Sequence, residues 1–330
     1  MPKPSDIESL IFKINNLDDF NELAIKIFHF QYKNNIVYRQ FVNNLEIDIL
    51  GITSLNEIPF LPIEFFKSHK VISFNQPAER SFSSSGTSGL KTSNHFIADL
   101  CLYEKSFLNS FSLFYGNPED FVFIALLPSY LEKGGSSLVY MAEKLIQKSK
   151  HSESGFYLDE YKKLKSTLLN LKQQNKKTIL LGVTYALLDL AEDFAINYPD
   201  LIVMETGGMK GRRKEMVREE LHSVLTKGFD VNSIHSEYGM TELLSQAYSK
   251  GEGIFNCPPW MKIKIRDIND PFSFVNTGKT GGINVIDLAN LYSCSFIETK
   301  DLGKAYTNGS FEILGRFDNS DVRGCNLLID

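Results

Sequence analysis

The chain has 330 residues, of which 43% are hydrophobic and 23% are charged, and its formal net charge is -5. These proportions are typical of a globular protein with enough core for one large domain or two ordinary ones. The acidic balance excludes the electrostatic footprint of a surface that binds nucleic acid or an anionic membrane. No stretch approaches the roughly 18 consecutive apolar residues of a membrane-spanning helix, so no membrane span is expected.

Cysteine usage and the first residues bear on location. The four cysteines show no C-x-x-C pattern and no short-range pairing, which predicts neither a disulfide framework nor a zinc site. The N-terminal residues lack the apolar run of a signal peptide. We therefore expect a cytoplasmic protein.

Residues 5–45 have the apolar spacing of helices, with Ile7, Leu10, Ile11 and Ile14 three or four positions apart. The two prolines of residues 58–63 favour an extended passage. A short helix over 64–70 and a strand over 71–74 are expected next. Residues 1–80 are thus predicted to form an N-terminal helical layer.

Buried strands alternate with helices along the middle of the chain. Continuous apolar runs bounded by turn residues predict strands that are covered on both faces, and strands alternating with helices predict a parallel sheet. The expected strands are 121–127, 178–183 and 201–204, and the expected helices are 99–115, 138–147, 162–172, 185–196 and 213–225. Residues 81–260 are predicted to form an α/β core.

The pattern changes near residue 262. Segments 262–267, 282–287 and 310–314 alternate apolar and polar residues, which predicts half-exposed antiparallel strands. Residues 261–330 are therefore expected to form a smaller β subregion with a C-terminal tail. The predicted fold class is α/β, with a mainly parallel sheet flanked by helices and this antiparallel addition.

Residues 81–89 read Ser-Phe-Ser-Ser-Ser-Gly-Thr-Ser-Gly, a stretch with little side-chain bulk. Its hydroxyls and backbone N–H groups suit the oxygens of a polyphosphate, while a plain surface loop is the alternative. The stretch is not a Walker A loop, because only two residues separate Gly86 from Gly89 and no Lys-Ser/Thr pair follows directly. The predicted phosphate loop is supported by other polar segments.

Together with this loop, two segments are expected near the carboxyl ends of strands, where ligands bind in open α/β sheets. They are residues 205–210 and 234–242. In the second, Tyr238 suits stacking on a planar base and Gly239 a close backbone approach. Thr241 suits a phosphate oxygen, and Glu242 suits Mg²⁺, which takes few protein oxygens beside phosphates and water. Near the end of the chain, residues 298–303 offer an acid to ribose hydroxyls. The α/β core of residues 81–260 is therefore predicted to bind a nucleotide.

The order of these motifs resembles the adenylate-forming superfamily. A Ser/Thr/Gly loop is followed by Tyr-Gly-x-Thr-Glu, Thr-x-Asp and Gly-Arg-x-Asp…Arg-Gly. Within that superfamily the chain is most similar to the LuxE-type acyl-protein synthetases, with the phenylacetate–CoA ligases as neighbours. Segments 28–38, 58–68 and 322–328 resemble the same family, so the resemblance covers nearly the whole chain.

The resemblance implies a reaction and residues for it. ATP and a carboxylic acid, expected to be a fatty acid, give acyl-AMP and pyrophosphate, and the acyl group then passes to a thiol. ATP and Mg²⁺ are the implied cofactors, with Glu242 on the metal and Thr241 on the α-phosphate. The remaining implied nucleotide contacts are Ser84, Ser85, Gly86, Thr87, Ser88, Gly89 and Lys91 on the phosphates, Gly207, Gly208, Tyr238 and Gly239 around the adenine, Asp301 on the ribose, and Arg316.

Cys325 is the implied acyl acceptor, because LuxE-type proteins carry such a cysteine near their C-terminus. Its neighbour Arg323 would favour the thiolate, while a buried cysteine of a closing strand is the alternative. His235 and His95 are candidates to orient the acyl carboxylate or the motif backbone, or else hydrogen-bonded structural histidines. Cys101 is expected in the core.

Three functions stay open at this stage. The chain is expected to stop near the hinge region at Asp318, without the C-terminal subdomain of other members of the superfamily. An acyl-protein synthetase, working with an acyl-transferring or acyl-carrier partner protein, is the main hypothesis. A ligase that uses CoA or a carrier protein, with a structural Cys325, is the second, and a non-catalytic nucleotide- or acyl-binding subunit is the third. The acid, the final acceptor and the oligomeric state are not predicted.

Overall fold

A computed structural model describes residues 4–84, 92–128, 135–158, 160–194, 196–208, 213–214 and 216–317. The chain divides into two compact units. The terminal unit contains residues 1–80, 93–98 and 256–330, and the central unit contains residues 81–92 and 99–255. The predicted division into residues 1–80, 81–260 and 261–330 remains a prediction.

The central unit is built on a mostly parallel sheet. Its strands follow the order β10-β9-β8-β7-β6-β4-β5, and β4 to β8 run parallel, while β9 is antiparallel to β8. The bounds are β4 Val122–Leu126, β5 Gly155–Phe156, β6 Thr178–Val183, β7 Ile202–Thr206, β8 His235–Tyr238, β9 Ala247–Ser249 and β10 Ile254–Asn256. All residues of β4 and β6 are buried, as their unbroken apolar runs predicted.

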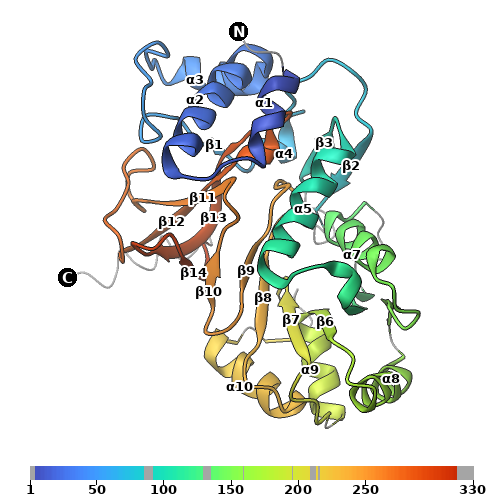
Figure 1. Ribbon diagram of the computed structural model, residues 1–330. Coiled ribbons are helices and arrows are strands. Elements are labelled where there is room, and N and C mark those ends of the chain that lie inside the picture. Colours follow the sequence, from blue (N-terminus) through green and yellow to red (C-terminus); the bar gives the residue numbers. More distant parts are fainter. Residues whose placement is uncertain are drawn as a thin grey trace, which may run out of the picture. The chain divides into compact units, whose positions relative to one another are not determined.

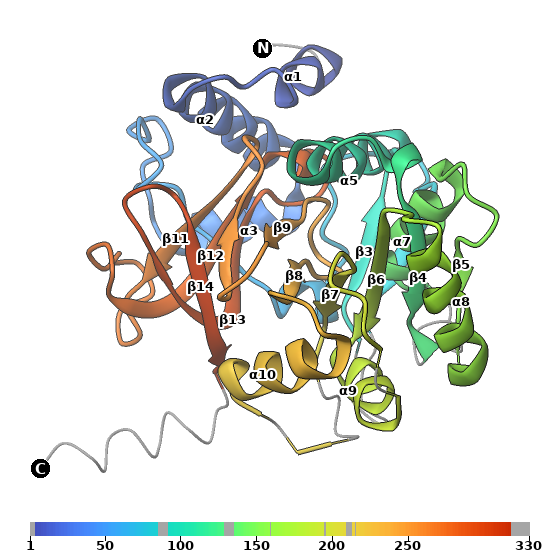
Figure 2. The same cartoon turned by 60° about the horizontal axis from the view of Figure 1, so that its bottom comes forward.

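Helices cover both faces of this sheet. Because crossovers between parallel strands are right-handed, the face on which a connecting helix lies depends on which side of the first strand the next strand is added. The chain moves outward from β4 to β5 through α7 (Ser137–Lys148) and then returns past β4 to β6 through α8 (Tyr161–Gln173). Helices α5 (Leu100–Tyr115) and α7 therefore share one face, and α8, α9 (Thr184–Asp193) and α10 (Arg218–Phe229) share the other (Figures 1 and 2).

The terminal unit joins the two ends of the chain in one antiparallel sheet. Strands β11 (Met261–Arg266), β12 (Thr280–Asp287), β13 (Phe296–Ala305) and β14 (Phe311–Arg316) are neighbours in that order. Strand β1 (Leu61–Pro62) pairs parallel to β13. The short segments outside these layers are α4 (Phe65–Ser68), β2 (Arg80–Ser83), β3 (Asn94–Ile97), η1 (Pro118–Asp120) and η2 (Leu288–Asn290).

N-terminal helices complete the terminal unit. Asn16 caps α2 (Leu17–Asn34) and Asn35 caps α3 (Ile36–Asn44) through side-chain oxygens that accept backbone N–H groups, and α1 (Pro4–Ile11) precedes them. Phe28 and Tyr38 lie 6.4 and 6.3 Å from Phe296 of β13, between ring centroids. The buried Gln31 side chain donates to the carbonyls of Asn290 and Leu291. The predicted helical layer is thus part of the core of this unit.

Several local predictions were wrong. Residues 71–74 carry no strand ladder; the backbone N–H and the hydroxyl of Ser73 donate to the carbonyls of Tyr292 and Ser293 instead. Helix α10 begins at Arg218 rather than at residue 213, and Arg213 forms ion pairs with α9. Cys101 is exposed on α5 instead of buried. Strand β13 was missed because its polar residues 298–301 do not alternate cleanly with apolar ones.

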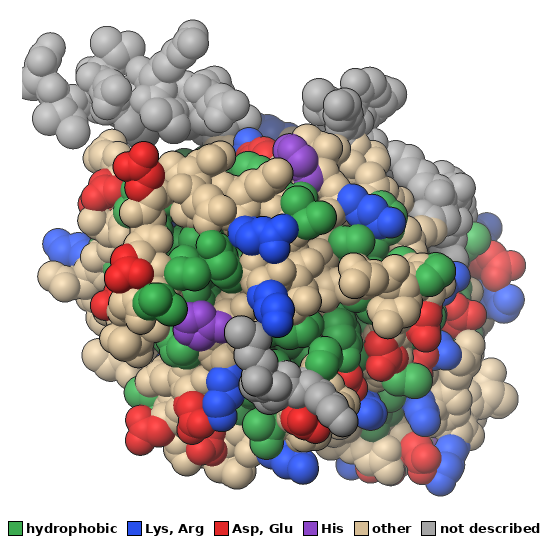
Figure 3. Space-filling view, turned by 90° about the horizontal axis from the view of Figure 1, so that it is seen from above, with side chains coloured by type: hydrophobic (Ala, Val, Ile, Leu, Met, Phe, Trp, Pro, Cys, Tyr) green, Lys and Arg blue, Asp and Glu red, His purple; other side chains and the backbone are tan. Residues whose placement is uncertain are grey.

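The charged side chains on the surface are of both signs, as the similar numbers of basic and acidic residues in the sequence indicate. Lys and Arg side chains are interspersed with Asp and Glu over the face drawn in Figure 3. In the part of the chain that the structure describes, no helix combines the length and the apolar character that crossing a lipid bilayer requires.

Candidate nucleotide-binding site

The ends of adjacent parallel strands bring two of the predicted segments together in the central unit. Register pairs Met204 with His235 and Glu205 with Ser236, so that Thr206 lies beside Glu237. The chain leaves β7 through Gly207, an exposed glycine at φ 75, and leaves β8 through Gly239. The edge of the sheet thus presents small residues with accessible backbone, which suits the close approach of a flat ligand.

One face of this edge holds a buried, poorly solvated acid. Thr206 Oγ1 donates to Glu237 Oε2 at 2.6 Å. Burial, and then the charge of Glu205, raise the pKa of Glu237 to about 7, although the hydrogen bond from Thr206 opposes the shift. The charge of Glu237 also raises the pKa of the buried tyrosines Tyr103 and Tyr248, after the larger effect of burial.

The opposite face holds a second acid that has cationic neighbours. Glu205 accepts from Thr184 Oγ1 at 3.2 Å, and its Oε1 lies 3.7 Å from both Arg218 Nη1 and His222 Nε2 of α10. Burial raises the pKa of Glu205, but His222 and the positive charge of Arg218 outweigh burial and lower it overall. The two carboxyls are therefore held in different protonation regimes on the two faces of one sheet.

The motif after β8 forms a tight turn. Leu243 N donates to Met240 O at 3.1 Å, which encloses Thr241 and the buried Glu242 in the turn. A Cβ atom at Gly239 would lie 2.4 Å from Glu237 Oε1, so the close approach that glycine allows is required by the acid behind it. The buried ring of Tyr238 packs edge-on against Phe255, 6.1 Å between centroids.

The start of the predicted phosphate loop belongs to the same unit. Phe82 of β2 packs 5.5 Å from the rings of both Tyr103 and Tyr140, and Ser83 N donates to Gly135 O at 2.9 Å. Ser84 follows directly and is half-buried. Tyr103, against which Phe82 packs, also has its pKa raised by the charge of Glu237, so β2 and Glu237 share this tyrosine as a neighbour. The other residues predicted to contact the phosphates, Ser85, Gly86, Thr87, Ser88, Gly89 and Lys91, lie outside the described part of the chain.

His235 lies at the amino end of β8, opposite to the end that carries Tyr238. Its Nδ1 is 3.0 Å from the hydroxyl of Tyr115. Burial, followed by the charge of Lys250, lowers the pKa of His235 to about 4. Among the two alternatives, this neutral, hydrogen-bonded environment favours the structural one. His95 is similarly buried in the terminal unit, with Nε2 2.8 Å from Ser293 Oγ.

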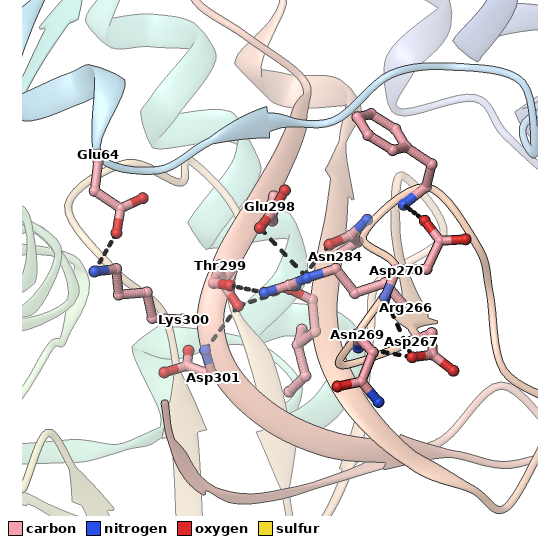
Figure 4. Close-up of polar contacts among 12 residues, drawn as sticks. Glu64, Arg266, Asp267, Asn269, Asp270, Asn284, Glu298, Thr299, Lys300 and Asp301 are labelled. Carbon is pink, nitrogen blue, oxygen red and sulfur yellow. Dashed lines mark hydrogen bonds and ion pairs between the residues drawn. The ribbon is translucent and has the colours of Figure 1, made fainter. Parts of the chain in front are cut away.

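Asp301 and Arg316 are neighbours in the terminal unit. They are register partners of β13 and β14, and Arg316 Nε lies 3.3 Å from Asp301 Oδ1. Asp301 is 8% exposed, whereas the Arg316 side chain is 74% exposed. Figure 4 shows Asp301 beside a buried arginine, Arg266, that sequence reasoning missed.

Metal chemistry is limited by the donor set. The described residues hold no group of three or more His, Cys, Asp or Glu side chains that could bind an ion. A single carboxylate such as Glu242 fits Mg²⁺, which binds through one or two carboxylates and takes its other ligands from phosphates and water. The site therefore suits a metal that arrives with a nucleotide.

Residues 205–210 and 234–242 were predicted to lie at this edge, but no individual role was predicted for Glu205, Thr206 or Glu237. An acid inside an otherwise buried strand, as in Ile-His-Ser-Glu-Tyr at 234–238, is the signal that could have identified Glu237, because such an acid needs a partner. Arg266 had no comparable signal, because it ends the strand Met-Lys-Ile-Lys-Ile-Arg, in which basic residues alternate regularly with apolar ones.

Among the described cysteines, two are poor nucleophiles. Burial, followed by the charge of Asp287, raises the pKa of Cys257 far above its usual value, and burial raises that of Cys294 to about 12. Cys101 is exposed. Cys325 lies outside the described residues.

Residues 6–100 match the family model described as acyl-protein synthetase, LuxE. A comparison with curated protein sequences finds no match.

Solved structures share the fold. An open conformation of 2-hydroxyisobutyryl-CoA ligase in complex with 2-HIB-AMP and CoA has a TM-score of 0.69 at 10% identity, over 93% of this chain and 77% of that chain. ATP-bound MatB from Rhodopseudomonas palustris has a TM-score of 0.55 at 17% identity, over 74% of this chain and 50% of that chain. An ATP-bound RpMatB-BxBclM chimera has a TM-score of 0.55 at 18% identity, over the same shares.

The chain spans half the length of these MatB structures. At such identities the likeness shows the fold alone. The predicted α/β fold is confirmed by its likeness to these ligase structures, and the predicted resemblance is confirmed by the match of residues 6–100 to the LuxE acyl-protein synthetase family model.

Proposed function

We propose that this protein activates a carboxylic acid with ATP and passes the acyl group to a thiol. The observation that carries the proposal is the pair of neighbouring strand ends, Gly207-Gly208 after β7 and Tyr238-Gly-x-Thr-Glu242 after β8. The LuxE match over residues 6–100 supports the same reaction. In the proposed complex, Mg²⁺ enters with ATP. The proposed location of the protein is the cytoplasm.

The first step joins the acid to AMP. A carboxylate oxygen attacks the α-phosphorus, the bond from that phosphorus to the pyrophosphate oxygen breaks, and pyrophosphate leaves. Charge on the phosphoryl oxygens must be neutralised and the reactants aligned. In the proposal the Thr241 hydroxyl donates to the α-phosphate, while Glu242 binds the ion that the nucleotide brings.

The nucleotide would be held at several points. Gly207, Gly208 and Gly239 leave room beside the adenine, and Tyr238 would line it. Ser84 would begin the phosphate contacts that Ser85, Gly86, Thr87, Ser88, Gly89 and Lys91 continue. Asp301 would accept from the ribose hydroxyls, and Arg316, which pairs with it at 3.3 Å and is largely exposed, would reach the nucleotide.

The second step moves the acyl group to sulfur. A thiolate attacks the acyl carbon, the bond from that carbon to the phosphate oxygen of AMP breaks, AMP leaves, and the thiol proton goes to solvent. We propose Cys325 as the acceptor. The half-buried Cys257 and the buried Cys294, with their raised pKa values, suit this role poorly. A fatty acid is the proposed substrate, and an acyl-transferring protein is the proposed next partner.

The test is acid-dependent pyrophosphate release from Mg-ATP, with a mixture of fatty acids, in wild type and Glu242→Ala. We expect the substitution to lower the rate about 100-fold, the size of effect seen when one transition-state stabilising contact is removed. Glu219→Ala, which removes an exposed acid from the first turn of α10, is the control for charge and should keep the wild-type rate. An unchanged rate in Glu242→Ala would exclude the proposed role of this residue. Tight ATP binding without turnover of any acid would instead favour a non-catalytic binding subunit.

A further inference from the structure

Arg266, the last residue of β11, is a buried cation with an unusual set of partners. It is 6% exposed. Its Nη1 donates to Ile283 O at 3.0 Å and to Asn284 Oδ1 at 2.8 Å, and its Nη2 donates to Thr299 O at 2.7 Å. Figure 4 shows the guanidinium between β12 and β13, pointing toward the stretch that carries Asp301.

The ladder between these two strands is interrupted where Arg266 lies. Gly282 pairs with Leu302 and Asn284 pairs with Glu298. Three residues of β13, Thr299 to Asp301, therefore stand opposite one residue of β12, which makes a bulge. Bulges leave backbone groups unpaired and re-aim side chains, and an unpaired buried carbonyl is costly.

Arg266 and Thr299 satisfy the backbone of the bulge. The guanidinium donates to the carbonyl of Thr299. Thr299 Oγ1 in turn donates to Ile283 O at 2.7 Å and accepts from Asp301 N at 3.1 Å. The position of Asp301 thus depends on Thr299, and that of Thr299 depends on Arg266.

The space for the guanidinium is built into β12. A Cβ atom at Gly282 would lie 2.4 Å from Arg266 Cζ, and one at Gly281 would lie 2.2 Å from Arg266 O. Gly282 therefore leaves room for the guanidinium against the strand, and Gly281 leaves room for the backbone of Arg266. The planar donor set of the arginine, which lysine lacks, matches several acceptors at once.

The charges around the bulge agree with this arrangement. Glu298 Oε1 lies 3.4 Å from Arg266 Nε. Burial lowers the pKa of Arg266, while the charges of Glu298 and Asp301 oppose that shift. Lys300, between Thr299 and Asp301, pairs with Glu64 instead. Asp301 is therefore left between Arg266 and the exposed Arg316.

We infer that Arg266 is a positioning residue for the ribose of the nucleotide: it fixes the bulge of residues 299–301 so that Asp301 can accept the ribose hydroxyls. The inference rests on the proposed function, in which Asp301 binds the ribose. Arg266 itself contacts neither the nucleotide nor the carboxylic acid substrate in the proposed complex.

The test is calorimetric binding of Mg-ATP, Mg-2′-deoxyATP and Mg-3′-deoxyATP. A hydrogen bond to a charged acceptor corresponds to a preference of about 10- to 100-fold, so wild type should prefer ATP over at least one deoxy analogue by that factor, and Asp301→Ala should lose the preference. Arg266→Lys, which keeps the charge but not the three directed bonds, should lose it too. Lys262→Met removes a half-buried cation of β11 that stacks on Phe20 and should keep it.

A second variant covers the case in which Arg266→Lys does not fold. Thr299→Val conserves shape but removes the hydroxyl between Ile283 O and Asp301 N, and it should lose the preference as well. If the role of Arg266 is purely structural, its substitution will lower the unfolding temperature and will weaken the binding of ATP and of both analogues by the same factor.

The outcomes separate the two proposals. A folded Arg266→Lys or Thr299→Val protein that keeps the wild-type preference overturns the inference. A wild type that binds ATP and both deoxy analogues equally overturns it too, while leaving ATP-dependent activation intact. A wild type that binds no ATP overturns the proposed function, and the inference with it.

Discussion

The two units hold buried acids by different means. In the central unit, Glu205 and Glu237 meet side-chain partners at the ends of β7 and β8, on opposite faces of the sheet. In the terminal unit, Asp301 depends on a bulge whose backbone is satisfied by the guanidinium of Arg266. Side chains hold the first pair of acids, whereas an arginine bonded to main-chain carbonyls holds the third.

This difference follows from the sheets. Parallel strands end at a common edge, so neighbouring residues reach one another through topology alone. An antiparallel strand continues past its neighbour, and a residue must be displaced from the ladder before it can be re-aimed. The acids of the central unit therefore find their side-chain partners at the strand ends, whereas the acid of the terminal unit depends on an arginine that bonds the backbone of the bulge.

The largest expected effect is on the terminal unit. Arg266→Met leaves the carbonyl of Thr299 and the carboxyl of Glu298 without the guanidinium. Breaking a buried charged pair and its hydrogen bonds costs about 3–5 kcal/mol. We expect a loss of about 4 kcal/mol in the free energy of unfolding, measured by urea denaturation at pH 7. Lys262→Met on the same strand should cost under about 1 kcal/mol, and equal losses in both variants would refute a special role for the bulge.

A pH-dependent effect is expected for Glu237. Its pKa of about 7 in the folded state lies above the usual 4.5, so the folded protein binds this proton more tightly than the unfolded chain. The contribution to stability is present below about pH 4.5 and is lost as pH rises through 7. Glu237→Gln, which keeps an acceptor for Thr206, should be about 3 kcal/mol more stable than wild type at pH 8. The two proteins should be equal near pH 4.5; a constant difference between pH 4.5 and 8 would contradict the shifted pKa.

The smallest expected effect concerns Glu205. Arg218→Met removes one of its two cationic neighbours and leaves His222, so we expect a loss of about 2 kcal/mol at pH 7, less than for a fully broken buried pair. Arg213→Met is the matched control, because its partners Asp189 and Glu192 are 34% and 51% exposed and such pairs contribute under about 1 kcal/mol. If the control loses as much stability as Arg218→Met, burial does not distinguish the two pairs.

Much of the central unit could be predicted from sequence, because strands buried on both faces are unbroken apolar runs, as in β4 and β6. The end of β7 before Gly207 followed from the same pattern, whereas β8 was not predicted because His235–Tyr238 is not an apolar run. The helical layer was predicted, but its place in the core of the terminal unit depends on long-range contacts such as Gln31 to Asn290.

The partners of the acids could not be predicted. The neighbours of Glu237 are Thr206 and Tyr103, which lie far apart in sequence and meet only through strand register and helix packing. Arg266 was missed because a bulge in β13 has no local sequence pattern, and Gly282, which makes room for its side chain, belongs to another strand.

The central claim is acyl activation followed by transfer to a thiol, and intact-protein mass spectrometry tests it most directly. Wild type, Cys325→Ser and Cys101→Ser would each be incubated with Mg-ATP and a mixture of fatty acids. Cys101 is the matched control because it is an exposed thiol. We predict an acyl-sized, hydroxylamine-labile mass gain in wild type and in Cys101→Ser, absent from Cys325→Ser. Wild type that gains no acyl mass and releases no pyrophosphate would contradict the account; release without the adduct would move the acceptor to CoA or a partner protein.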